Sequence, residues 1–151
     1  MKKYFLDLFE YNNWANDKII LRLQELEFNF TLGNPILILS HIITSQEYWL
    51  ERVKKKSSYN IYLWEEFSIQ ELGILSMNST KEWIKFISKI SDSKFQQMLE
   101  YKNLKGEDKS HTFQDIFQNV INHSNYHRGQ INKILKLEKC EPVDIDFISY
   151  C

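Results

Sequence analysis

Two histidines stand four residues apart in the second half of the chain, where their side chains could bind one metal ion. His123 and His127 occur in a segment whose apolar residues recur every three or four positions, so both project from one face of a predicted helix. Two imidazoles placed in this way can reach a single ion at about 2.0–2.1 Å. Both also fall on the apolar stripe between Val120 and Ile131, where a buried imidazole needs a hydrogen-bond partner or a metal. The pattern leaves two interpretations open, a metal site and a pair of hydrogen-bonded core histidines.

A third ligand would have to come from elsewhere in the chain, which has two more histidines. His41 falls in the first turns of another predicted helix, where a single histidine is more often a packed or capping residue. His111 lies in a polar segment, and we interpret it as a solvated loop residue. Zinc proteases with a His-Glu-x-x-His helix place a glutamate directly after the first histidine, whereas Ser124 occupies that place here. No strong general base is therefore visible in the sequence.

Four long amphipathic segments must position these side chains. The chain has only 4 Gly and 2 Pro in 151 residues, where average usage gives about 18. Both residues punctuate turns, so their scarcity disfavours β-sandwiches and barrels, and the lack of a Gly-rich loop disfavours doubly wound folds. The apolar periodicity predicts helices over about residues 3–26, 35–55, 69–90 and 112–137. We expect an all-α protein, a single domain over residues 1–151 built as a four-helix bundle.

Three of these helices begin at residues that favour capping. The signals are Asn34 followed by Pro35, the capping box of Ser68 with Glu71, and the similar pair of Thr112 with Asp115.

The connections between the helices indicate how they are arranged. The short connection over residues 27–34 predicts that the first two helices are antiparallel neighbours, and the longer connections that follow allow crossovers. Residues 95–99 could form a short helix, and residues 101–111 a loop or a weak hairpin. The end of the chain, residues 138–151, is expected to be a short tail packed on the bundle.

Several of these segments together resemble the DinB superfamily. The resemblance covers nearly the whole chain, and its most specific part is the stretch from His123 to Gln130. The matching residues are Asn13-Trp14-Ala15-Asn16, His41 with Glu47-Tyr48-Trp49-Leu50 after it, the run from Asn122 to Gln130, and Pro142, Asp146, Phe147 and Tyr150 in the tail.

The resemblance implies a bundle with an unusual order of helices and a divalent metal held by three histidines. Residue by residue, these ligands are His41, His123 and His127. Three neutral nitrogen ligands leave a position open for water or substrate, which is the layout of a catalytic site. Imidazole ligands suit zinc and nickel, and they do not choose between them. The resemblance also implies a homodimer.

Three further side chains are candidates for supporting roles at such a site. Tyr48 falls on the same helical face as His41, and Asn16 is a weaker candidate from the first helix. Arg128 follows the last proposed ligand and points about 100° away from it. It could bind an anionic group, although we favour its pairing with a carboxylate. Gly129, in the middle of a predicted helix, indicates a close approach of two helices.

Three functions are compatible with this site. In the first, a metal activates the thiol of a small cofactor for attack on an electrophile, as the resemblance implies for some members of the family. This function is favoured because coordination itself deprotonates a thiol and no base is needed. The alternatives are metal-dependent hydrolysis of a small ester or amide by a bound water, and a non-catalytic, stress-related role in binding metal.

Composition narrows the partners and the compartment. The 19 basic and 20 acidic residues are nearly balanced, which argues against a nucleic-acid surface. No apolar run approaches the roughly 18 residues of a membrane span, and Asp7 and Glu10 interrupt the N-terminal apolar stretch, so no signal peptide is predicted. Cys140 and Cys151 are too few and too late for a disulfide framework. We expect a cytoplasmic protein with free thiols that acts on a small molecule.

Overall fold

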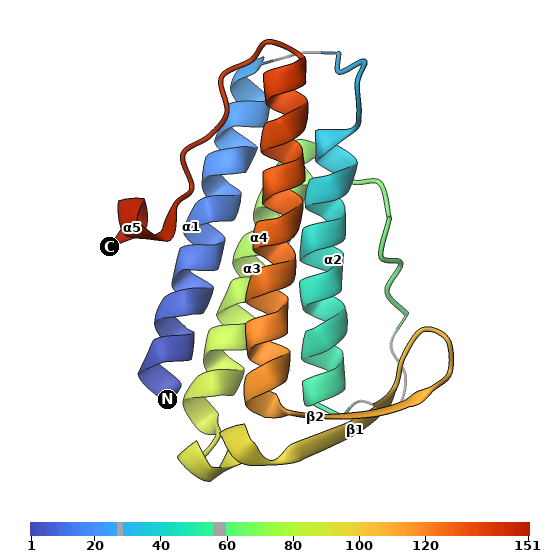
Figure 1. The fold of residues 1–151 in the computed structure, drawn as a ribbon, viewed down its shortest axis with the longest axis vertical. Helices are drawn as coiled ribbons and strands as arrows, with labels where there is room; N and C mark the ends of the chain where they lie inside the picture. Colours follow the sequence, from blue (N-terminus) through green and yellow to red (C-terminus); the bar gives the residue numbers. More distant parts are fainter. Residues whose placement is uncertain (27–28, 56–59) are drawn as a thin grey trace.

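The computed structural model describes residues 1–26, 29–55 and 60–151 and contains four long helices (Figure 1). These helices are α1 (Lys2–Leu26), α2 (Pro35–Val53), α3 (Ile69–Lys89) and α4 (Phe113–Leu137). Each begins and ends within two residues of its predicted bounds. The prediction of an all-α four-helix bundle is confirmed.

The predicted capping residues hold the starts of three helices. The side chain of Asn34 accepts a hydrogen bond from the backbone N–H of Leu37 at 2.9 Å. Reciprocal capping boxes form between Ser68 and Glu71 at the start of α3 and between Thr112 and Asp115 at the start of α4. These bonds satisfy backbone donors that a helix end otherwise leaves without partners.

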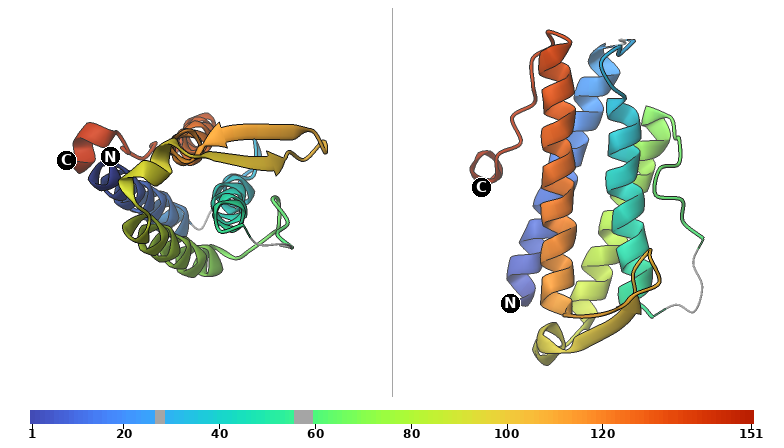
Figure 2. Two further views of the ribbon diagram at one scale, coloured as in Figure 1. Left: turned by 90° about the horizontal axis from the view of Figure 1, so that it is seen from below. Right: turned by 45° about the vertical axis from the view of Figure 1, so that its right-hand side comes forward.

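The helices occupy the four corners of the bundle in the order α1, α3, α2, α4 (Figure 2). Helices α1 and α4 run in one direction, and α2 and α3 run in the other (Figure 1). The prediction that α1 and α2 are neighbours is wrong, because they are antiparallel but lie across a diagonal, each packed on other helices. The connection over residues 27–34 can reach across the bundle, because eight fully extended residues span up to about 26–29 Å.

A long connection runs from the end of α2 to the start of α3, because these two helices point the same way. Its described part, residues 60–67, passes along the outside of α2 (Figure 1). This is one of the crossovers that the sequence allows, and it brings backbone carbonyl groups next to the middle of α2.

The bundle core consists of two apolar clusters with polar side chains between them. One cluster lies around Phe9, Trp83 and Phe117, and the other around Ile43 and Leu135. On every helix the residues between the two clusters include buried polar side chains, which we call the polar layer: Asn12, Asn16, Gln46, Ser76, Ser79 and Arg128.

Hydrogen bonds connect the polar layer through all four helices. Arg128 donates to the side-chain oxygens of Asn12 and Asn16, at 2.8 and 2.7 Å. Asn12 donates to Gln46 at 2.7 Å, and Gln46 donates to Ser79 at 2.8 Å. Buried polar groups are stable only when paired in this way.

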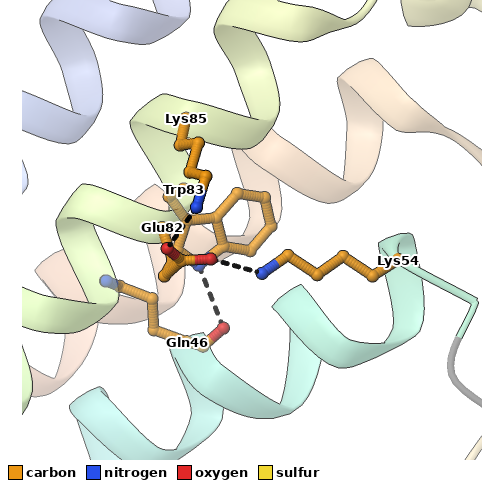
Figure 3. Close-up of polar contacts among 5 residues, drawn as sticks. All are labelled: Gln46, Lys54, Glu82, Trp83 and Lys85. Atoms are coloured by element: carbon orange, nitrogen blue, oxygen red, sulfur yellow. Dashed lines mark hydrogen bonds and ion pairs between the residues drawn. The ribbon is translucent and has the colours of Figure 1, made fainter.

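The contact between α2 and α3 adds a buried indole next to this layer (Figure 3). Trp83, which is fully buried, donates from Nε1 to the backbone carbonyl of Gln46 at 3.1 Å. Nearer the surface, Glu82 pairs with Lys54 and Lys85 at 2.9 and 3.3 Å. These partly exposed pairs contribute little to stability compared with the buried indole.

A small hairpin joins α3 to α4, which is one of the two alternatives that the sequence leaves open for residues 101–111. It follows a 3-10 helix, η1 (Asp92–Gln96), and pairs β1 (Met98–Lys102) with antiparallel β2 (Asp108–Thr112). The predicted helix over residues 95–99 is displaced towards the N-terminus, because Met98 already belongs to the strand. The hairpin lies across the lower end of the bundle (Figure 1).

The C-terminal tail packs on the bundle, along α1, and ends in the short helix α5 (Phe147–Tyr150). Val143 exchanges two hydrogen bonds of 2.9 Å with the side chain of Asn132. The hydroxyl of Tyr11 donates to the carbonyl of Ile145 at 2.8 Å. Cys140 and Cys151 are both free thiols. None of the described helices combines the length and the apolar character that crossing a membrane requires.

Candidate metal centre

Three histidines from two adjacent helices bring their ring nitrogens together. His41 comes from α2, and His123 and His127 come from successive turns of α4; one ligand atom of each lies within 4.8 Å of the others. The Nε2 atoms of His123 and His127 are 3.1 Å apart. Two nitrogens bound to one ion at about 2.0–2.1 Å are separated by roughly 3–3.5 Å, so this spacing fits a shared ion. The group could therefore hold a metal ion.

Carbonyl oxygens orient two of the three rings. Nδ1 of His41 lies 2.7 Å from the backbone carbonyl oxygen of Leu63, and Nδ1 of His127 lies 2.7 Å from Oε1 of Gln130. A carbonyl oxygen only accepts hydrogen bonds, so in both rings Nδ1 carries the proton and Nε2 keeps its lone pair. Partners of this kind fix the ring orientation at metal sites.

The contact between His123 and His127 suits both interpretations of the sequence. Without an ion, Nε2–H of His123 can donate to the Nε2 lone pair of His127; with an ion, both nitrogens can present lone pairs to it. The approach of His41, whose ring centroid is 5.1 Å from that of His123 and 4.7 Å from that of His127, adds a third nitrogen that a simple hydrogen-bonded pair does not need.

Burial favours the neutral, metal-binding form of two of these imidazoles. The pKa of His123 is lowered to about 4, mainly by burial and then by repulsion from the charged forms of His127 and His41. Burial also lowers the pKa of His41, and the hydrogen bond to the Leu63 carbonyl opposes this shift. A neutral imidazole offers a lone pair without first losing a proton, which favours metal binding at neutral pH.

Residues 60–67, which we call the crossover segment, cover one side of the site. The indole of Trp64 stacks on the ring of His41, with centroids 3.8 Å apart and planes within 3°. Ser40 and Thr44, on either side of His41 in α2, donate to the carbonyls of Glu65 and Leu63. This segment therefore holds the His41 ring between α2 and an aromatic plane.

The site opens on its other side into a cavity of about 360 Å³ between α2 and the hairpin. His41 and His123 form part of its wall. The aromatic rings of Tyr48, Trp49 and Tyr101 form another part. A small molecule in the cavity would have direct access to the histidines.

The structure places Tyr48, Asn16 and His111 in three different surroundings. Tyr48 lies on the wall of the cavity, and its hydroxyl accepts a hydrogen bond from Arg52 at 3.0 Å. Asn16 belongs to the polar layer, where it donates to Ser76 at 3.2 Å. His111 lies on β2 and is exposed, with Nδ1 3.0 Å from the hydroxyl of Tyr101.

The prediction that Arg128 pairs with a carboxylate is wrong. Its side chain is fully buried and its partners are the amide side chains of Asn12, Asn16 and Asn125. Burial lowers its pKa to about 10, so the guanidinium remains charged at neutral pH. The turn of about 100° between successive residues directs Arg128 into the core while His127 faces His123 and His41.

The prediction that Gly129 marks a close approach of two helices is also wrong. It is exposed, and a Cβ atom added there would meet no other atom within 4 Å. A close approach of two helices does not explain this glycine.

Sequence analysis misses two groups that orient the histidines. Gln130 could have been found, because it follows His127 by three residues and so lies on the same helical face. The carbonyl of Leu63 could not, because a backbone group in an irregular segment leaves no pattern of side chains.

Comparisons with known proteins identify the family and agree with the fold. The family model described as the DinB family matches residues 1–151. Protein DinB of Bacillus subtilis (strain 168) is 27% identical over 151 aligned positions, which cover 90% of this chain and 87% of that protein. The crystal structure of a DinB-like protein from Bacillus cereus ATCC 10987 superposes with a TM-score of 0.73 at 15% identity, covering 91% of this chain and 93% of the other. The chain therefore belongs to the DinB family.

Proposed function

We propose that this protein is a metal-dependent enzyme that activates a small thiol for transfer to an electrophilic substrate. The observation that carries the proposal is the convergence of three histidines beside a cavity, which His41 and His123 line and whose described lining includes no carboxylate. Such a site can bind a nucleophile next to a metal, and it offers no side chain to act as a strong base. These conditions suit a thiol, because coordination alone deprotonates sulfur.

His41, His123 and His127 would hold the ion, and zinc and nickel both suit three imidazoles. When bound, the ion supplies a Lewis acid that lowers the pKa of a thiol beside it. Leu63 and Gln130 keep the rings of His41 and His127 oriented.

The reaction proposed at this site is a substitution that needs no oxidant or reductant. The thiol loses its proton to solvent at the cavity mouth, and its sulfur forms a bond to an electrophilic carbon. The leaving group departs from that carbon with its electron pair. The rings of Tyr48, Trp49 and Tyr101 line the cavity and offer apolar surface to the electrophile.

The function is tested with protein loaded with zinc or nickel, N-acetylcysteine as the thiol and an activated haloaromatic as the electrophile. We expect a conjugation rate above that of the His41→Ala variant, and a chelator should remove the difference. His111→Ala is the matched control, because it removes a histidine that lies outside the site. Equal rates for the natural protein and His41→Ala would contradict the proposal. Chelator-sensitive cleavage of esters without a thiol would favour the hydrolase alternative.

The role of Gln130 gives a separate prediction about affinity. We expect Gln130→Ala to weaken zinc binding about 10- to 100-fold, because Nδ1 of His127 loses the acceptor that orients its ring. Gln130→Glu keeps an acceptor and should retain most of the affinity. Competition with a chromogenic chelator measures both. Gln118→Ala, elsewhere on α4, is the control, and an unchanged affinity in Gln130→Ala would show that the contact does not support the site.

A further inference from the structure

The cavity beside the three histidines carries positive charge on its wall. Arg52 and Lys105 both line it, and its described lining contains neither Asp nor Glu. Its volume of about 360 Å³ lies at the lower end of the range for small-molecule sites. A cavity lined by one sign of charge attracts ligands of the opposite sign.

Arg52 is held rigidly in this wall. Its side chain is 8% exposed, and its guanidinium carbon lies 4.4, 4.8 and 4.7 Å from the ring centroids of Tyr48, Trp49 and Tyr101. Its Nη2 donates to the carbonyl of Lys102 at 2.7 Å. This contact and the one to the Tyr48 hydroxyl hold the guanidinium beside the aromatic rings. A planar guanidinium fixed in this way suits a planar carboxylate.

The loop between the two strands brings Lys105 to the same cavity. The side-chain oxygen of Asn103 accepts hydrogen bonds from the backbone N–H groups of Lys105 and Glu107, at 2.9 and 3.0 Å. Gly106 next to Lys105 has a φ of 80°, a left-handed conformation that favours glycine. The loop therefore has a defined conformation that fixes the backbone of Lys105 at the cavity.

Lys105 also differs from the other lysines of the hairpin. Lys102 pairs with Asp108 at 2.7 Å, and Lys109 pairs with Glu107 at 3.0 Å. In the described part of the chain, the ammonium group of Lys105 pairs with no carboxylate. Its charge is therefore available to a ligand in the cavity.

We propose that this cavity binds a small organic carboxylate. The carboxylate faces Arg52 and Lys105, and the rest of the molecule extends along the aromatic rings towards His41 and His123. This inference deepens the proposed function, because it gives the charge of a molecule bound at that site. The carboxylate can belong to the thiol or to the electrophile, and the two sources differ in the outcome of the test.

The test compares three compounds of similar size: N-acetylcysteine, its primary amide and N-acetylalanine. Calorimetric titration measures the affinity of zinc-loaded protein for the two thiols and of metal-free protein for N-acetylalanine. We expect N-acetylcysteine to bind about 10-fold or more tightly than the amide, as hydrogen bonds to a charged group allow. This preference should shrink as salt is raised.

Four variants test whether the cavity wall causes this preference. We expect Arg52→Gln to lose about 10-fold in affinity for both carboxylates, and Lys105→Gln, at an exposed position, to lose about two- to fivefold. Lys109→Gln removes a positive charge from the same hairpin but does not line the cavity, so it should change neither affinity. Arg52→Lys keeps the charge and should retain part of the binding if the hairpin stays in place.

The outcomes separate this inference from the proposed function. In one outcome, N-acetylalanine binds in a way that depends on Lys105, and zinc loading does not increase the affinity for the thiol. This outcome supports the carboxylate site and assigns it to the electrophile. It also opposes thiol activation. Zinc-dependent binding of both thiols with equal affinity, together with no binding of N-acetylalanine, supports thiol activation and overturns the carboxylate site. Failure of both carboxylates to bind, or a preference unchanged in Arg52→Gln and Lys105→Gln, also overturns it.

Discussion

Replacing His123 by alanine should reduce the affinity for zinc by more than about 100-fold and leave the helical fold in place. The loss should exceed the 10- to 100-fold cost of removing an orienting partner, because one of three ligating nitrogens disappears. The fold should survive because two apolar clusters and the polar layer hold the four helices without any contact through His123. Metal analysis of purified protein and circular dichroism measure the two effects.

The same experiment distinguishes a functional from a structural metal. His111→Ala, which removes a histidine outside the group, should keep full zinc content. Chelation should lower the melting temperature of the natural protein only slightly, because the core of the bundle is formed independently of the site. Equal zinc content in His123→Ala and the natural protein would exclude the three-histidine site, and unfolding on chelation would support a structural metal instead.

Replacing Arg128 by methionine should lower the free energy of unfolding by about 2–4 kcal/mol. The methionine fills a similar volume but leaves the buried oxygens of Asn12 and Asn16 without their donor, and each unsatisfied buried group costs about 1–3 kcal/mol. Relief of the buried charge offsets part of this cost, since burial disfavours the charged guanidinium. Urea denaturation measures the difference.

Arg22→Met on α1 is the control for this prediction. Arg22 lies at the surface, where it contacts Glu25 and the carbonyl of Glu141, so its loss should change stability by less than about 0.5 kcal/mol. If Arg128→Met proved as stable as the natural protein, the polar layer would contribute nothing to stability. Zinc affinity should change little in either variant, because Arg128 does not contact the three histidines.

The parts of this molecule that follow a regular spacing could be predicted from the sequence. Helical periodicity and three capping signals identify the bundle, and the spacing of His123 and His127 places two of the three histidines on one face. His41 is different, because periodicity alone does not connect it to α4. Its assignment comes from the resemblance to the DinB superfamily, and the structure shows the proximity that spacing could not.

The remaining features depend on contacts between segments far apart in the chain. The diagonal placement of α1 and α2 follows from how four helices share their apolar faces, which the length of one connection does not determine. The surroundings of Arg128 depend on which residues of α1 face it, and the sequence around Arg128 does not show these residues. The stacking of Trp64 on His41 depends on the path of the crossover, and residues 60–67 have no periodicity that would predict that path.

The polar layer also limits how the bundle can change shape. A helix that slid along its neighbour by one turn, about 5.4 Å, would move Arg128 away from Asn12 and Asn16 and leave a buried charge facing apolar side chains. Sliding of the helices is therefore costly, and the positions of the three histidines along the bundle axis are fixed relative to one another. Any opening or closing around a ligand must come from the hairpin loop and the crossover segment, which border the cavity and lie outside the layer. The four helices therefore form a rigid support, and the segments that can move lie on the side of the bundle that carries the cavity.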